Sequence, residues 1–207
     1  MKYPWDKWDE KGWERAKKIG RTAAKLFSRK GFLETTMDEI AGVAKVSKGG
    51  IYYYFKSKTE VLFFVLSEYM DLILKDLEQH LGELEVTHDK LEFIILRHVE
   101  LYANNLAEGK VLLHETHCLP KKYYSTIAEK ERCYFQIVAG VLEDLFPKLV
   151  PKSKLTAVTF ILFGMCNWIY SWYDPKGSIT PQELGEIIYE LFLRGLHNFT
   201  ASPRSSV

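Results

Sequence analysis

The sequence has few cysteines and no long apolar run, and these absences exclude several classes of protein. Its three cysteines, Cys118, Cys133 and Cys166, are odd in number and far apart, which favours reduced thiols over a disulfide framework. The longest apolar run, residues 160–166, is far shorter than the roughly 20 residues that a membrane-spanning helix needs. The N-terminus leads into polar sequence without the apolar core of a signal peptide. We therefore expect a soluble cytoplasmic protein with no membrane partner.

Patterns typical of catalysis, β-strands and internal repeats are also missing. No segment resembles a nucleophile elbow, a phosphate-binding loop or a paired-carboxylate site, so the sequence predicts neither an enzyme nor a cofactor. His114 and His117 are three residues apart, whereas the zinc motif H-E-x-x-H places its histidines four apart, and we expect no metal site there. Apolar residues recur at helical spacing and nowhere alternate with a period of two, which predicts an all-α fold.

Over the whole chain the positive and negative charges nearly balance, with a formal net charge of +1. The N-terminal segment and the rest of the chain nevertheless differ in net charge. Residues 1–60 hold 14 Lys and Arg against 8 Asp and Glu, whereas the remaining residues hold 14 against 19. A basic N-terminal segment on an acidic body suits a segment that contacts phosphates. The same imbalance is also compatible with ordinary solvated helix faces.

Apolar periodicity predicts about nine helices. A first helix over about 13–30 ends at Gly31 and precedes two short helices, one containing residues 37–44 and one beginning near Lys48. Further helices are expected over about 58–81, 91–105, 111–118, 121–146, 153–172 and 181–199. Residues 1–11 are expected to form a mobile arm or an irregular start to the first helix, and residues 201–207 a disordered tail.

The stretch from Thr35 to Lys58 predicts two short helices around a tight turn. Thr36 is a plausible N-cap with Glu39 three residues later, which is the capping-box pattern, and Ser47 can cap the second helix. The second helix directs Ile51 inward and leaves a lysine, small residues and tyrosines outside. This layout is that of a helix-turn-helix, which places its second helix in the major groove of DNA.

Together these residues resemble the N-terminal signature of the TetR family of one-component transcriptional regulators, over about residues 13–62. The matching positions are Ala24, Phe27, Gly31, Thr35-Thr36, Ile40-Ala41, Ala44, Val46-Ser47-Lys48-Gly49, Ile51-Tyr52, Tyr54-Phe55 and Ser57-Lys58. The resemblance implies a three-helix DNA-binding domain at residues 1–58 and a helical ligand-binding and dimerisation domain at residues 59–200. It implies a double-stranded, palindromic DNA operator as a partner.

The resemblance also implies the DNA contacts. Thr36 and Lys58 lie at helix N-termini, where phosphates bind, and Tyr52 occupies the family's phosphate-binding tyrosine position. Gly50 departs from the family, which often has threonine there, and this removes one potential base contact. The predicted DNA-binding residues are Thr36, Ser47, Lys48, Gly49, Tyr52, Tyr53, Tyr54 and Lys58.

A recognition helix this short contacts few base pairs, so useful specificity requires a homodimer that reads two half-sites. The helices at 153–172 and 181–199 are more apolar than one small core requires, and in the resembled family the corresponding helices form a four-helix bundle across a two-fold axis. The predicted interface residues are Leu155, Val158, Leu162, Ile169, Ile188, Leu191 and Phe192.

The segment 167–177, followed by Thr180-Pro181-Gln182-Glu183-Leu184, resembles the C-terminal signature of TetR-like regulators that release DNA on binding an acyl-CoA. Asp174 departs from this pattern, because relatives often carry arginine there. The effector is therefore expected to be a small hydrophobic molecule, with an acyl-CoA as one candidate, or else these aromatic residues only fill the core. The predicted pocket residues are Phe93, Leu96, Tyr102, Phe135, Phe163, Asn167 and Trp168.

These patterns predict a ligand-responsive DNA-binding regulator, most simply a repressor. One alternative is a helical carrier or enzyme in which the N-terminal motif is only structural, and it predicts no salt-dependent DNA binding. Another is a DNA-binding protein with a filled core and no effector.

Overall fold

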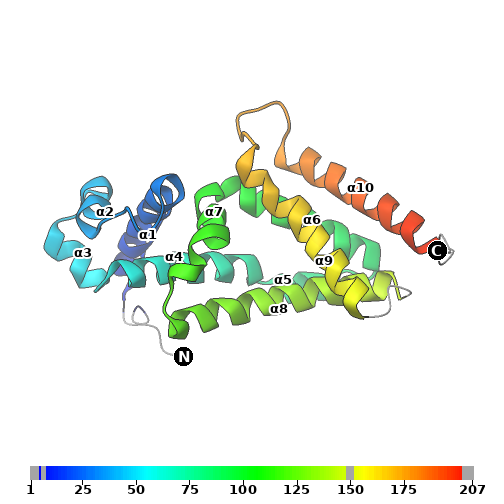
Figure 1. Cartoon of the computed structure of the whole chain (residues 1–207), viewed down its shortest axis with the longest axis horizontal. Helices are drawn as coiled ribbons and strands as arrows, with labels where there is room; N and C mark the ends of the chain where they lie inside the picture. The colour runs from blue at the N-terminus through cyan, green and yellow to red at the C-terminus, as the bar shows by residue number, and fades with distance from the viewer. Residues whose placement is uncertain (1–4, 6–7, 148–151, 202–207) are drawn as a thin grey trace. The chain divides into compact units, whose positions relative to one another are not determined.

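The structure is a computed structural model that describes Trp5 and residues 8–147 and 152–201. Within these ranges the regular elements are ten α-helices and two short 3-10 helices, without a strand (Figure 1). The predicted all-α class is confirmed. Of the predicted disordered tail, Ala201 is the last residue of a helix, and residues 202–207 lie outside the described residues.

A first compact unit contains the described residues up to 72 together with residues 107–129. It holds α1 (Glu10–Lys30), α2 (Met37–Ala44), α3 (Lys48–Tyr54) and most of α4 (Lys58–Leu74). It also holds α7 (Leu106–Glu115) except its first residue, η1 (Thr116–Cys118) and the start of α8 (Lys121–Leu145). α1 packs on α2 and α2 on α3. Their inward faces form a core that includes Ala16, Ile19, Phe27, Ile40 and Ile51.

The second compact unit contains residues 73–106 and the described residues from 130 onward. It holds α5 (Leu77–Glu83), α6 (Thr87–Asn104), the rest of α8, α9 (Lys152–Asn167), η2 (Trp168–Ser171) and α10 (Pro181–Ala201). α10 packs chiefly against α6. Gly185 makes this approach possible, because a Cβ at that position would lie 2.6 Å from Leu96 Cδ2. The units divide the chain differently from the predicted ranges 1–58 and 59–200, and α4 and α8 contribute residues to both.

The predicted continuous helix over 58–81 is wrong, because the structure has two helices there. α4 ends at Leu74, Asp76 adopts a left-handed backbone conformation with φ 54°, and α5 begins at Leu77. Arg97 of α6 donates a hydrogen bond to the Lys75 carbonyl at 2.8 Å, which satisfies one of the carbonyls freed at the break. The apolar spacing from Ile73 to Leu77 is helical on both sides, so periodicity alone does not reveal the interruption.

Two tryptophans of the N-terminal segment, for which a mobile arm was one of two predictions, pack against the rest of the first unit. Trp5 is 4% exposed, and its ring lies 5.4 Å from the ring of Phe63 and 5.1 Å from that of Phe64. Trp8 lies 5.6 Å from Phe55 and 6.0 Å from Phe64. For Trp5 and Trp8 the mobile arm is therefore wrong, because burying two indole rings in an aromatic cluster stabilises an ordered segment. The other prediction, an irregular start, agrees with α1 beginning at Glu10.

Candidate nucleic-acid interface and effector site

The helix-turn-helix is stabilised locally by the caps that the sequence predicts. Thr36 Oγ1 accepts the Glu39 N–H at 3.2 Å, and Ser47 Oγ accepts the Gly50 N–H at 3.0 Å. The Glu39 carboxylate accepts a hydrogen bond from Lys30 Nζ at 2.6 Å, which lowers the pKa of Glu39. These bonds fix the ends of α2 and α3 and therefore the direction of α3.

The exposed face of α3 carries four of the predicted DNA-binding residues. Tyr53 is 73% exposed and Tyr52 is also exposed. Gly49 has open space where a side chain would begin, so the backbone there can approach a ligand closely. The ammonium of Lys48 lies 2.9 Å from the carboxylate of Asp38 in α2, and this hydrogen bond raises the pKa of Lys48. Sequence reasoning missed Asp38, which places a negative charge beside the predicted base-reading lysine.

Tyr54 differs from the other tyrosines because it is half-buried. Its ring packs edge-on against Trp8 at 5.4 Å and against Tyr53 at 5.1 Å. The prediction that the helix leaves Tyr54 outside is therefore corrected to a half-buried position, since Trp8 packs against its ring.

Lys58 is directed inward, which argues against the predicted phosphate contact through its ammonium. Lys58 Nζ donates to the carbonyls of Phe32, Leu33 and Thr35 at 2.6, 3.0 and 2.6 Å, and it lies 4.4 Å from the centre of the Phe32 ring. Three carbonyls match the three protons of an ammonium group. Lys58 thus stabilises the connection between α1 and α2.

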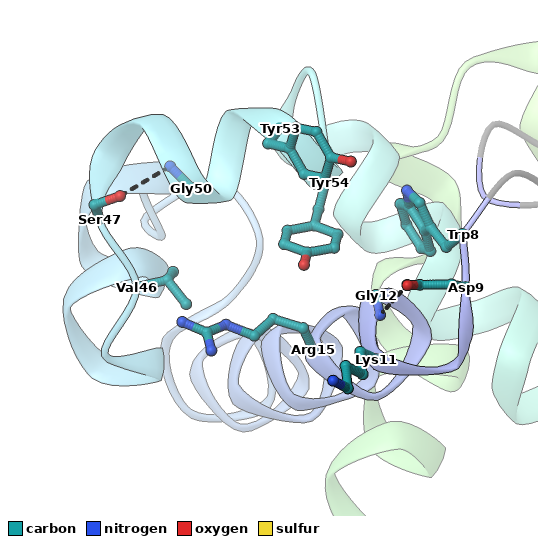
Figure 2. Close-up of a pocket in the computed structure, with 10 residues that line it drawn as sticks. All are labelled: Trp8, Asp9, Lys11, Gly12, Arg15, Val46, Ser47, Gly50, Tyr53 and Tyr54. Carbon is teal, nitrogen blue, oxygen red and sulfur yellow. Dashed lines mark hydrogen bonds between the residues drawn. The ribbon is translucent and has the colours of Figure 1, made fainter.

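A groove of about 790 Å³ lies between the start of α1 and the recognition helix α3 (Figure 2). Its α1 side carries Lys11 and Arg15, and its α3 side carries the rings of Tyr53 and Tyr54. The other lining residues are Trp8, Asp9, Gly12, Val46, Ser47 and Gly50. Sequence reasoning did not single out Lys11 and Arg15, although their spacing of four residues places both on one face of a helix.

The second unit has a buried polar cluster centred on His98 of α6. His98 Nδ1 lies 2.8 Å from the Tyr134 hydroxyl, and Nε2 lies 2.8 Å from Asn167 Oδ1. Because a carbonyl oxygen only accepts, Nε2 carries the proton and Nδ1 accepts from Tyr134. The imidazole also stacks on Tyr102 at 4.9 Å, and Phe163 lies 6.0 Å away.

Burial keeps this histidine neutral. Desolvation lowers the pKa of His98 from 6.5 to about 4, although the hydrogen bond to Asn167 opposes the shift. Desolvation likewise raises the pKa of Tyr134 and Tyr102 above their ordinary values. The cluster is therefore an uncharged arrangement of donors and acceptors inside an aromatic shell. His98 was missed, although its four-residue spacing from Tyr102 places the two rings on one face of α6.

The structure brings together part of the predicted pocket. Tyr102, Phe163 and Asn167 surround His98, and Phe135 lies 6.2 Å from Phe163. The other three predicted residues lie elsewhere: Phe93 stacks on His80, Leu96 packs against Gly185, and Trp168 is 60% exposed.

Six of the seven predicted interface residues belong to the interior of this chain, and the prediction is corrected for them. They are Leu155, Val158, Leu162, Ile169, Ile188 and Phe192, and each is buried. Only Leu191 is exposed. The same elements expose a different set of apolar side chains. These are Phe160 and Ile161 of α9, Trp168 of η2, Trp172 directly after η2, and Ile187 of α10. The helices were chosen from their apolar content, but which apolar face points inward depends on the tertiary packing.

Asp174 has a local role that accounts for an acid at this position. Its carboxylate accepts the Lys176 N–H at 2.9 Å, and its carbonyl accepts the Gly177 N–H at 2.8 Å, which together close a tight turn. Tyr173 is buried nearby, and its hydroxyl donates to the Ile179 carbonyl at 3.0 Å. These bonds set the connection from η2 to α10.

Within the described ranges, no group of three or more His, Cys, Asp or Glu side chains is arranged to hold a metal ion. Among the helices of those ranges, none is both long and apolar enough to cross a membrane.

A capped helix-turn-helix with an exposed second helix, followed by a helical unit with a polar centre, defines a class of DNA-binding regulators. Residues 19–64 match the family described as bacterial regulatory proteins, tetR family, and residues 85–196 match the tetracyclin repressor-like C-terminal domain. The chain belongs to the TetR family of transcriptional regulators.

Three relatives illustrate the likeness. The fatty acid metabolism regulator protein of Bacillus subtilis is 25% identical over 183 residues, which cover 85% of this chain and 92% of that protein. A TetR-family regulator from Bordetella parapertussis is 31% identical with a TM-score of 0.84, covering 88% of this chain and 96% of that one. AibR, solved in complex with isovaleryl coenzyme A and operator DNA, is 23% identical with a TM-score of 0.75, covering 86% and 97%.

Proposed function

We propose that the protein is a cytoplasmic transcriptional repressor without enzymatic activity. It binds a palindromic operator as a homodimer. It leaves the operator when a hydrophobic effector binds in the second unit, and an acyl-CoA is the first candidate for that effector. The observation that carries the proposal is the exposed recognition face of α3 on a chain whose second unit has a separate, buried polar and aromatic centre. The fatty acid regulator and the acyl-CoA complex among the relatives support this choice of effector.

Operator recognition falls to α3. Lys48, Tyr52 and Tyr53 present a cation and two hydroxyls outward, which are groups that contact base edges and phosphates. α3 has only seven residues, so one copy reads few base pairs. A two-fold dimer that reads two half-sites one helical turn apart supplies the missing specificity.

The dimer interface is assigned to the exposed apolar face of α9, η2 and α10. On α10, Ile187 and Leu191 are four residues apart and border a shallow groove of about 530 Å³. The acidic residues beside them are engaged within the same helix region: Glu186 accepts from Gln182, and Glu190 pairs with Arg194, each at 2.8 Å. The apolar side chains of Ile187 and Leu191 therefore remain available to contact the same surface of a second copy, as an isologous interface requires.

The effector site is assigned to the surroundings of His98. Tyr102 and Phe163 provide aromatic surface for an acyl chain, and Asn167 provides an amide for a carbonyl oxygen. Entry of a carbonyl group there would replace one of the two internal hydrogen bonds of His98. Because α4 and α8 contribute residues to both units, a ligand that favours one placement of these helices shifts the DNA-binding unit.

A thermal-shift assay with acyl-CoAs of increasing chain length, the matching free acids and coenzyme A alone tests the effector assignment. A ligand that binds only the folded state raises the transition temperature by mass action. We expect a rise with acyl-CoAs of one range of chain lengths and a smaller rise for Asn167→Ala. A rise with free hydrophobic acids only would discard the CoA thioester. No rise with any compound would favour the filled-core alternative, in which His98 and its partners only stabilise the fold.

A further inference from the structure

The groove between α1 and α3 carries a net positive charge. Lys11 and Arg15 are exposed, and within the described residues neither makes an ion pair. Asp9 also lines the groove, where it caps α1 by accepting the Gly12 N–H at 2.8 Å, and Glu14 pairs with Lys17. The lining therefore holds two cations against one carboxylate. Two cations that face a groove without an internal partner are available to an external anion.

The position of the groove indicates which anion. A helix with its side chains is about 10–12 Å across, and the DNA major groove is about 12 Å wide. A recognition helix that enters the major groove is therefore flanked by the two sugar-phosphate strands. One strand must pass beside α3, and on the α1 side of α3 the protein surface is this groove.

The lining of the groove suits a sugar-phosphate strand. Lys11 and Arg15 supply charge for phosphate oxygens, Tyr53 and Tyr54 supply hydroxyls, and the Trp8 ring supplies an apolar surface for deoxyribose. Gly50 adds no side chain to the lining. The Lys58 ammonium, by contrast, is bound to three carbonyls and is not directed outward for a phosphate.

We propose that the groove is a phosphate-binding site for the operator strand beside the recognition helix, with Lys11 and Arg15 as its charged ligands. This rests on the proposed function, since it requires α3 to lie in the major groove. The contact fixes the register of the protein on DNA and carries no base information, so it strengthens cognate and non-cognate binding equally.

The experiment compares wild type, the double variant Lys11→Ala/Arg15→Ala and the control Arg132→Ala/Lys176→Ala. The control removes the same two charge types from exposed positions in the second unit. The probes are a labelled duplex selected from random sequence by the wild-type protein and a scrambled duplex of equal length. Affinity is measured by fluorescence anisotropy between about 50 and 200 mM KCl, the range in which phosphate contacts weaken most visibly.

The plot of log affinity against log salt should be shallower for the α1 variant by roughly 0.9 for each phosphate that the protein no longer neutralises, hence about 1.8 per protomer. Both duplexes should bind more weakly by the same factor, so the specificity ratio stays constant. Neutral methylphosphonate linkages beside each half-site should weaken wild type and control but not the α1 variant. Equal slopes for wild type, control and α1 variant would overturn the site while leaving the repressor proposal intact. Absence of salt-dependent binding by wild type would overturn the proposed function itself.

Discussion

At the scale of single residues, the recognition surface combines attraction and repulsion. Lys48 faces outward from α3, but its ammonium is held 2.9 Å from the Asp38 carboxylate. Both side chains are largely exposed, so water screens the pair and its contribution to stability is small. Its larger effect is on binding, because a carboxylate beside DNA repels phosphates and competes for the lysine.

Replacing Asp38 by asparagine should therefore strengthen DNA binding several-fold, with selected and scrambled duplexes affected alike. Fluorescence anisotropy at low salt measures this directly. Asp144→Asn removes the same charge from an exposed position in the second unit and should leave affinity nearly unchanged. Weaker binding by Asp38→Asn, confined to the selected duplex, would show instead that Asp38 itself accepts a hydrogen bond from a base.

His98 makes folding stability depend on pH. Its pKa is about 4 in the folded protein and 6.5 in the unfolded chain, so between these values the unfolded chain binds more protons. The stability from the neutral ring is complete above pH 6.5 and is lost as the pH falls towards 4. The difference corresponds to roughly 3 kcal/mol at the acid limit. Denaturant unfolding at pH 7, 6, 5 and 4.5 measures the decline.

His98→Gln isolates this contribution, because glutamine keeps a donor and an acceptor but has no charge to gain. Its stability should be lower at pH 7 and should fall less between pH 6.5 and 4.5 than that of wild type. Parallel pH profiles for the two proteins would assign the acid sensitivity to the carboxylates and the remaining histidines.

At the scale of helices, one close contact determines how α10 lies on α6. A Cβ at Gly185 would lie 2.6 Å from Leu96 Cδ2 and 3.2 Å from Leu96 Cα, so both a side chain and the backbone obstruct it. Gly195 on the same helix has open space around it. Two glycines of one helix therefore have opposite expected responses to substitution.

Gly185→Ala should destabilise the fold by roughly 1–3 kcal/mol, because overpacking exceeds the helix propensity gained. Gly195→Ala should stabilise it by about 0.5–1 kcal/mol, since alanine loses less backbone entropy than glycine. Urea unfolding of both variants tests the pair. Combining Gly185→Ala with Leu96→Ala should recover part of the stability, and stabilisation by Gly185→Ala alone would refute the close approach.

The helices also show which features the sequence could predict. Caps such as Thr36 and Ser47 act over three residues, so they are readable in the sequence and both form as predicted. The break between α4 and α5 coincides with a hydrogen bond from Arg97, 22 residues away, and local periodicity contains no trace of it. The same limit applies to Lys58, whose direction depends on carbonyls more than 20 residues earlier.

The buried residues of the second unit show the same contrast between features set by neighbouring residues and features set by distant ones. Tyr102 and Phe163, two of the predicted pocket residues, each lie near His98. The polar centre, His98 with Tyr134 and Asn167, depends on three helices meeting and cannot be read from one segment. For the predicted interface, the choice of apolar face required knowing which residues of α9 and α10 are already buried in the packing with α6.

At the scale of the whole molecule, the proposed function requires two copies. Leu191→Glu places a charge in the proposed interface and should convert the dimer to a monomer in sedimentation experiments while leaving the helical content unchanged. Operator affinity should fall by at least tenfold, because the second half-site no longer contributes. Leu113→Glu adds the same charge at an exposed leucine of α7 and should remain dimeric. A dimeric Leu191→Glu protein would place the interface elsewhere.

In the proposed mechanism, an effector in the second unit weakens DNA binding by the first. The most direct test of this mechanism is operator affinity of the wild-type protein, measured by anisotropy, over a titration with the acyl-CoA that gives the largest thermal shift. We predict an affinity decrease of roughly 5- to 150-fold, the usual range of allosteric coupling, and a reciprocal decrease of acyl-CoA affinity on operator-bound protein. An operator affinity that stays constant at saturating acyl-CoA would rule out release of the operator by this effector.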